Sequence, residues 1–133
     1  MLVVIDTNVL VSAFWSRNGN PARILGMVLS GSLKACYDFR ILEEYRNVLL
    51  RSKFGFSGDE VEAVLRTIED NGYSVVADTV GIPFTDESDR KFYEVAKYCG
   101  AKLITGNVKH FPQEPDIMPP AEFLALLPRI NEG

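Results

Sequence analysis

The stretch Met1-Leu-Val-Val-Ile-Asp6-Thr7-Asn8 decides the fold, because it joins an apolar strand directly to a carboxylate. Leu2 to Ile5 is short, unbroken and rich in β-branched residues, a pattern typical of a strand buried on both faces of a parallel sheet. Asp6 follows at the carboxyl end of this strand, the edge at which open α/β sheets bind ligands. An isolated buried carboxylate is costly, so Asp6 is predicted either to bind a metal or to cap the next turn.

Length and composition are those of an ordinary globular protein. The 133 residues predict one domain over residues 1–133, with 47% apolar and 24% charged residues. The net charge of −4 does not indicate a nucleic-acid binder, and it does not exclude one, because binding depends on local patches. Neither a membrane span nor a signal peptide is expected. Cys36 and Cys99 form no metal motif, and such a pair fits a reduced, cytoplasmic protein as well as any other.

Strands and helices alternate along the chain. Strands are predicted at residues 2–5, 33–37, 74–77, 101–105 and 116–118. Helices are predicted at 9–15, 21–30, 38–51, 58–71 and 87–98, and from 119 onward, with Asn20 as the N-cap of the second and Pro21 at its first position. This order predicts a three-layer α/β/α domain with a mainly parallel sheet of about five strands.

Three acids from separate elements are predicted to face inward or to lie beside the core. In the 38–51 helix, Glu44 lies roughly 100° from the centre of the apolar stripe and Glu43 roughly 160°. Glu43 should therefore face solvent, whereas Glu44 lies at the edge of the stripe, with a solvated flank position as the alternative. Asp89 projects within roughly 70° of the apolar face of the 87–98 helix, in its first turn, where an ordinary first-turn acid is the alternative. Asn107 follows the 101–105 strand at the same edge as Asp6.

Carboxylates brought together in this way should raise some of one another's pKa values. The usual resolution is a hard cation, and oxygen ligands without His or Cys favour Mg²⁺ or Mn²⁺ over zinc. Such an ion suits phosphate chemistry, because it can activate water and neutralise charge on phosphoryl oxygens. The sequence contains neither a GxxxxGK[ST] loop nor a GxGxxG motif, so nucleotide or dinucleotide binding has no support.

Four sequence pieces, in this order along the chain, carry a resemblance to a known family. They are Val-Ile-Asp6-Thr7-Asn8, Ile-Leu-Glu-Glu44-Tyr, Asp86-Glu-Ser-Asp89-Arg-Lys-Phe92 and Leu-Ile-Thr105-Gly106-Asn107. With them the chain resembles the PIN-domain family of metal-dependent ribonucleases. It looks most like the toxin-type members, VapC-type and its relatives, of bacterial and archaeal toxin–antitoxin operons.

The resemblance implies roles for particular residues. Asp6, Glu44 and Asp89 match the metal-binding acids. Asn107 stands where many members have a fourth Asp, and its uncharged amide puts the affinity for a second metal in doubt. The residues expected to support the site are Thr7, Asn8, Asp86 and Thr105.

The same resemblance implies a function. It implies a cytoplasmic Mg²⁺- or Mn²⁺-dependent endoribonuclease that leaves a 5′-phosphate and a 3′-hydroxyl. It also implies an RNA substrate, a homodimer, and a cognate antitoxin whose tail covers the acidic site.

His110, in the loop after the 101–105 strand, either assists a leaving group or contacts phosphate, or it is structural or faces solvent. Basic residues that could line a path for the RNA backbone are Arg17, Arg40, Arg46, Lys91 and Lys109.

Two other functions are open at this point. One is a PIN-fold module that binds RNA without cleaving it, because Asn107 weakens the site. The other is a phospho-receiver domain, for which Asp78 and Thr105 follow suitable strands. Receivers also need an early acidic pair and a Lys after the fifth strand, whereas here Asp6 stands alone and Met118-Pro119-Pro120 occupies the later place.

Overall fold

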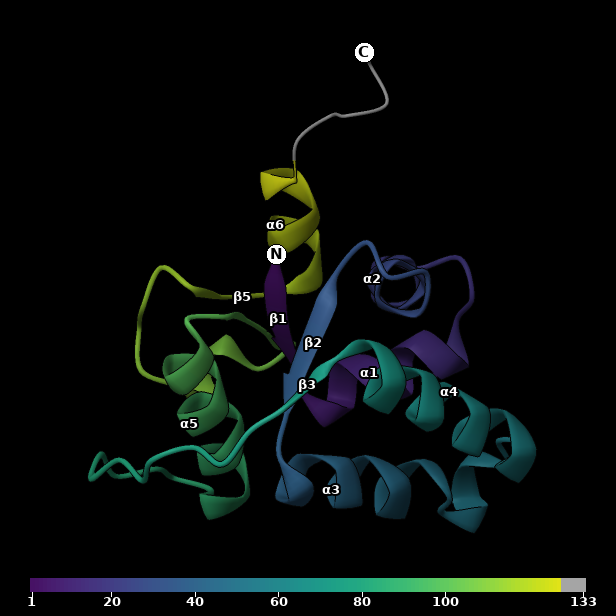
Figure 1. Ribbon diagram of the computed structural model, residues 1–133, viewed down its shortest axis with the longest axis horizontal. Coiled ribbons are helices and arrows are strands. Elements are labelled where there is room, and N and C mark those ends of the chain that lie inside the picture. Colours follow the sequence, from purple (N-terminus) through teal and green to yellow (C-terminus); the bar gives the residue numbers. More distant parts are fainter. Residues whose placement is uncertain (128–133) are drawn as a thin grey trace.

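Five parallel strands form the centre of the computed structural model, which describes residues 1–127 (Figure 1). The sheet has the order β3-β2-β1-β4-β5. Every adjacent pair is parallel, as the sequence predicts. The strands are β1 (Leu2–Ile5), β2 (Lys34–Tyr37), β3 (Tyr73–Ser74), β4 (Lys102–Ile104) and β5 (Ile117–Met118).

Helices cover both faces of this sheet and confirm the α/β/α class. Helix α5 packs on β1, β2 and β4, whereas α4 packs on β2 and joins α1 and α2 on the other side (Figure 1). Helix α3 lies beyond the carboxyl ends of β1 and β2, in contact with both α4 and α5 (Figure 1). The helices are α1 (Thr7–Trp15), α2 (Asn20–Leu29), α3 (Phe39–Leu49), α4 (Gly58–Asn71), α5 (Arg90–Cys99) and α6 (Pro120–Leu126). Short 3-10 turns are η1 (Ser52–Phe54), η2 (Glu87–Asp89) and η3 (Val108–His110).

Strand β1 is central because its side chains are apolar on both faces. Val3 and Val4 are fully buried and Ile5 is nearly so. Burial of each such side chain stabilises the fold by about 1.5–3 kcal/mol. With β2 and β4 on its two sides, β1 delivers Asp6 to the middle of the carboxyl edge of the sheet.

The third strand is shorter than the predicted 74–77. The amide of Val75 still donates to the carbonyl of Tyr37 at 2.9 Å, but Val76 is 91% exposed and the chain then leaves the sheet. The strand stops there because β2, its partner, ends at Tyr37 and offers no further backbone groups. The following segment is held at Val80, whose amide donates to the buried carboxylate of Glu94 at 3.0 Å.

Three predicted helix starts are also displaced. Helix α1 begins at Thr7 rather than Val9, so Thr7 and Asn8 lie in its first turn. In α2 the N-cap is Gly19, not Asn20. The helix predicted from residue 87 begins at Arg90, because the Asp86 carboxylate accepts the Ser88 amide at 2.9 Å and forms a tight turn first.

Among residues 1–127, no helix has both the length and the apolar character needed to cross a membrane. The prediction of a single domain over 1–133 includes residues 128–133, which lie outside the described residues. Both cysteines in the described part are free thiols, with Cys36 buried.

Candidate functional site

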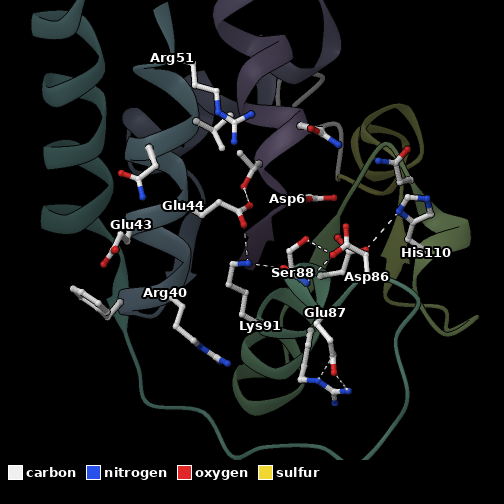
Figure 2. A pocket seen from close by; sticks show the side chains of 18 residues that line it. Asp6, Arg40, Glu43, Glu44, Arg51, Asp86, Glu87, Ser88, Lys91 and His110 are labelled. Atoms are coloured by element: carbon white, nitrogen blue, oxygen red, sulfur yellow. Dashed lines mark hydrogen bonds and ion pairs between the residues drawn. The ribbon is translucent and has the colours of Figure 1, made fainter.

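A pocket of about 830 Å³ opens at the carboxyl edge of the sheet, between α3 and the turn that leads into α5 (Figure 2). Asp6, Glu44 and Asp89 all line it, although they come from three separate elements. Asn107, from the segment after β4, lines it as well. The structure therefore brings the predicted acids to one place, together with the supporting residues Thr7, Asn8 and Asp86.

Asp6 is 5% exposed and is oriented by two residues that follow β4. Its Oδ2 accepts a 2.7 Å hydrogen bond from the Thr105 hydroxyl, and the backbone N–H of Asn107 donates to that hydroxyl oxygen at 2.9 Å. The second bond directs the Thr105 proton toward Asp6. Although Asp6 occupies the N-cap position of α1, its side chain makes no cap hydrogen bond, so the capping alternative is wrong.

Glu44 is held by two other side chains. The Thr7 hydroxyl donates to Oε2, and the Lys91 ammonium lies 2.7 Å from Oε1 (Figure 2). Glu44 is partly buried and Glu43 is exposed at the rim of the pocket, as the helical phase predicts. The solvated-flank alternative for Glu44 is therefore wrong, because the chain itself contacts both carboxylate oxygens.

Asp89 and Asp86 differ in their partners. The Asp86 Oδ1 accepts the amide and the hydroxyl of Ser88, at 2.9 and 2.8 Å. Asp89 is predicted in the first turn of the helix, but it stands at the N-cap position of α5, one residue before the helix begins, without a side-chain cap bond. In the described part of the chain, its buried Oδ2 receives no hydrogen bond. His110 Nδ1 lies 3.5 Å from that oxygen, and half of the His110 side chain is exposed.

The electrostatics of the pocket follow from burial and crowding. Burial is the main cause that raises the pKa of Asp6. The hydrogen bond from Thr105 lowers this pKa, and the charges of Asp89 and Glu44 raise it. Burial also raises the pKa of Asp89, with the Asp86 charge next in importance. The prediction that clustered carboxylates raise one another's pKa values is confirmed in direction for these two acids.

A family model described as PIN domain matches residues 2–109, most of the chain. The chain belongs to the PIN-domain family. PIN domains are typically nucleases and generally use divalent metals, so the family supports a phosphodiester hydrolase. No curated protein and no solved structure matches the chain, and the toxin subtype has no support from a relative. Asp78, which the phospho-receiver alternative requires, lies exposed after β3 and outside the pocket lining.

The donor set of this PIN domain fits a hard cation. It consists of carboxylate and amide oxygens, and the Asp89 oxygen without a hydrogen-bond donor has a lone pair to offer. Yet within residues 1–127 no three Asp, Glu, His or Cys side chains are arranged closely enough to hold a metal ion. The oxygen ligands are therefore of the kind that a hard cation prefers, but in this structure they lie too far apart to coordinate one together.

Only some of the basic residues predicted to line a path for the RNA backbone lie in the pocket of this PIN domain. Lys91 and Arg40 line the pocket. Arg17 and Arg46 instead pair with Glu60 at 3.1 Å and Glu62 at 3.0 Å, and Lys109 is exposed outside the lining.

Several residues that line the pocket are not predicted from the sequence, among them Arg51 and Ser88. The helix predicted over 38–51 would place Arg51 two turns after Glu44 on the same face, but α3 ends at Leu49 and Arg51 lies beyond it in extended conformation. Ser88 had no comparable signal, because its place depends on the Asp86 turn.

Proposed function

We propose that this PIN domain is a metal-dependent endoribonuclease and the toxin of a toxin–antitoxin pair. The observation that carries the enzymatic part is the meeting of Asp6, Glu44 and Asp89 in one pocket. Their convergence from distant parts of the chain has no structural need, since buried like charges cost stability. Membership of a family of nucleases supports the same conclusion.

Asp6, Glu44 and Asp89 would hold Mg²⁺ or Mn²⁺, with the Asn107 amide oxygen assisting. When bound, the ion supplies an activated water and neutralises charge on the phosphoryl oxygens. Thr105 and Thr7 would hold Asp6 and Glu44 in position through the hydrogen bonds described above. In-line hydrolysis would leave a 5′-phosphate and a 3′-hydroxyl, with the proton of the attacking water passing to solvent or to a nearby carboxylate.

The substrate backbone would follow the wall that α3 forms. Arg40 lines the pocket near the start of this helix and Arg51 lines it two residues after the helix ends, and Figure 2 shows Glu44 between them. The guanidinium of Arg40 is shared with Asp38 at 2.7 Å and Glu94 at 2.9 Å, which leaves Arg51 as the better phosphate contact. An RNA strand is the proposed substrate because the resemblance to ribonuclease members of the family implies it.

The test is cleavage of a single-stranded RNA by purified protein with Mg²⁺, with Mn²⁺, or with EDTA. We expect metal-dependent products that carry 5′-phosphates, and loss of at least about 100-fold in rate for Asp6→Asn and Asp89→Asn. A DNA strand of the same sequence tests the preference for RNA. Metal-independent cleavage, or equal rates for the wild type and both variants, would contradict the proposal.

A second candidate is a module that binds RNA without cleaving it. Two observations favour it. Within the described residues the acids are not close enough to form a metal cluster, and Asn107 supplies an uncharged amide in place of a fourth carboxylate. The same experiment separates the two, when RNA binding is followed by filter retention alongside cleavage. Binding that needs no metal, with no product at any metal concentration, would support this candidate.

The toxin assignment, the antitoxin, the homodimer and the cytoplasmic location rest on the resemblance to toxin-type members. The test is expression in a bacterial host, alone and together with the product of the neighbouring gene. We expect growth arrest that requires Asp6 and is relieved by that product. Growth unaffected by expression would contradict the toxin assignment without touching the nuclease assignment.

A further inference from the structure

We propose that the ammonium of Lys91 is an internal counter-ion that holds Glu44 in the metal-free protein and must release it before a divalent cation binds. This inference rests on the proposed function, because it concerns the same metal site. It makes Lys91 a positioning residue that acts through Glu44.

Lys91 forms a short, largely shielded ion pair with Glu44. Its Nζ lies 2.7 Å from Glu44 Oε1 and donates to the Ser88 carbonyl at 2.5 Å (Figure 2). The side chain is only 12% exposed, compared with 54% for Lys97 and 32% for Lys102, which pair with surface acids. The Lys91–Glu44 pair is therefore the most shielded of the lysine pairs found among residues 1–127.

The position of Lys91 in its own helix is unfavourable to a cation. It is the second residue of α5, near the positive end of the helix dipole. A shielded ammonium at this end needs acids from other elements to offset its cost. Glu44, from α3, supplies the compensating carboxylate, so the contact is specific to the fold and not to the local helix.

The pair also accounts for the arrangement of the acids. Thr7 contacts one carboxylate oxygen of Glu44 and Lys91 the other, whereas the Asp89 Oδ2 receives no hydrogen bond in the described part of the chain. Contacts from the chain thus occupy both carboxylate oxygens of Glu44, whereas the buried Oδ2 of Asp89 has no hydrogen-bond donor among the described residues. The three acids line one pocket without forming a metal cluster among residues 1–127, which agrees with Glu44 being held by the ion pair.

Competition between two cations follows from this geometry. With Asp6, Glu44 and Asp89 ionised, the three acids carry a charge of −3, and the adjacent ammonium reduces the net charge to −2. A divalent ion that takes Glu44 must displace the ammonium and lose that neutralisation. Removal of the ammonium should therefore tighten metal binding, the opposite of what a merely structural defect would do.

The experiment is calorimetric titration with Mn²⁺ of the wild type, Lys91→Met, Lys91→Gln and the control Lys109→Met. Lys109 carries the same charge near the site but is exposed and outside the pocket lining. We expect about tenfold tighter binding for both Lys91 variants and a much smaller change for Lys109→Met. Lys91→Gln retains hydrogen-bond donors and serves as the second variant if Lys91→Met does not fold. Melting in EDTA should show a lower Tm for Lys91→Met, because Glu44 then loses its partner.

Each outcome decides the matter. Equal affinity of the wild type and the Lys91 variants, or an equal gain for Lys109→Met, would overturn the role of Lys91. Binding by the Lys91 variants alone would support it strongly. If no protein binds Mn²⁺, both this inference and the metal site of the proposed function fail, whereas RNA cleavage by the wild type is measured separately.

Discussion

The hydroxyl of Tyr45 donates a 2.5 Å hydrogen bond to the carbonyl of Ile5. This contact joins the residue after Glu44 to the residue before Asp6, so it sets the separation between α3 and the end of β1. Tyr45 is 2% exposed and Ile5 is 3% exposed. Burial, together with the charges of Asp6 and Glu44, raises the pKa of the Tyr45 phenol, which stays a neutral donor.

Tyr45→Phe should lower both stability and metal affinity. The substitution leaves the buried Ile5 carbonyl without its donor, which costs about 1–3 kcal/mol in free energy of unfolding. It also loosens the placement of Glu44 relative to Asp6. The measurements are urea denaturation and Mn²⁺ titration, with Tyr98→Phe as the control, since Tyr98 is 54% exposed. Equal effects of the two substitutions would show that the Tyr45 contact does not position the site.

Glu44→Gln should reduce RNA cleavage by orders of magnitude, whereas Glu43→Gln should leave it nearly unchanged. The two residues are adjacent, but Glu44 is bonded by Thr7 and Lys91 inside the pocket, and Glu43 is exposed at its rim. Initial rates at saturating Mg²⁺ provide the comparison, and each variant is the control for the other. A reversed result would mean that Glu43 is the ligand and that α3 turns on substrate binding.

Much of this arrangement can be predicted from sequence because it depends on local patterns. The apolar run of β1 determines its burial and therefore the position of Asp6. The 3.6-residue period of α3 distinguishes Glu44 from Glu43, and the capping residue Asp38 accepts the Ile41 amide at 3.0 Å at the helix start.

The remainder depends on contacts between distant parts of the chain. Lys91 reaches Glu44 across 47 positions of sequence, and Thr105 reaches Asp6 across 99. Helical and strand periodicities predict which face a residue lies on, but not which distant residue it contacts. Likewise, β3 ends early because its partner β2 ends at Tyr37. Helix α5 starts late because the Asp86 side chain competes with the helix for the Ser88 amide.

The stability of the metal-free protein should depend on Asp6 and pH in a defined direction. The pKa of Asp6 is raised above its ordinary value of 3.8 by burial first, then by neighbouring charge. The folded protein therefore binds more protons than the unfolded chain between 3.8 and the raised value, and stability falls as pH rises through that window. In EDTA, the stability of Asp6→Asn relative to the wild type should increase from acid to neutral pH.

Glu62→Gln is a control of opposite sign. The hydrogen bond from Arg46 lowers the pKa of Glu62, so its stabilisation is present above the unfolded-state pKa and is lost as pH falls. The stability of Glu62→Gln relative to the wild type should therefore decrease as pH rises. Denaturant titrations at several pH values measure both differences. The same slope for the two variants would refute the assignment of a raised pKa to Asp6.

Asn107→Asp should tighten metal binding and destabilise the metal-free protein. Asp6, Glu44 and Asp89 carry a charge of −3 when ionised, so one divalent ion leaves them near −1 and a second ion gains little. Asn107 lines the pocket and its backbone already bonds to Thr105, so a carboxylate there adds negative charge close to the acids. That charge attracts the second ion, and without metal it repels the other carboxylates.

The two effects should appear together, because one added charge causes both. Mn²⁺ titrations of the wild type and the variant measure the gain, and melting curves in EDTA measure the loss. Asn47→Asp is the matched control, since Asn47 lines the same pocket but is an exposed residue of α3. Unchanged Mn²⁺ affinity together with an unchanged Tm in EDTA would mean that the side chain at 107 points away from the acids, and its assignment as a fourth ligand would then be withdrawn.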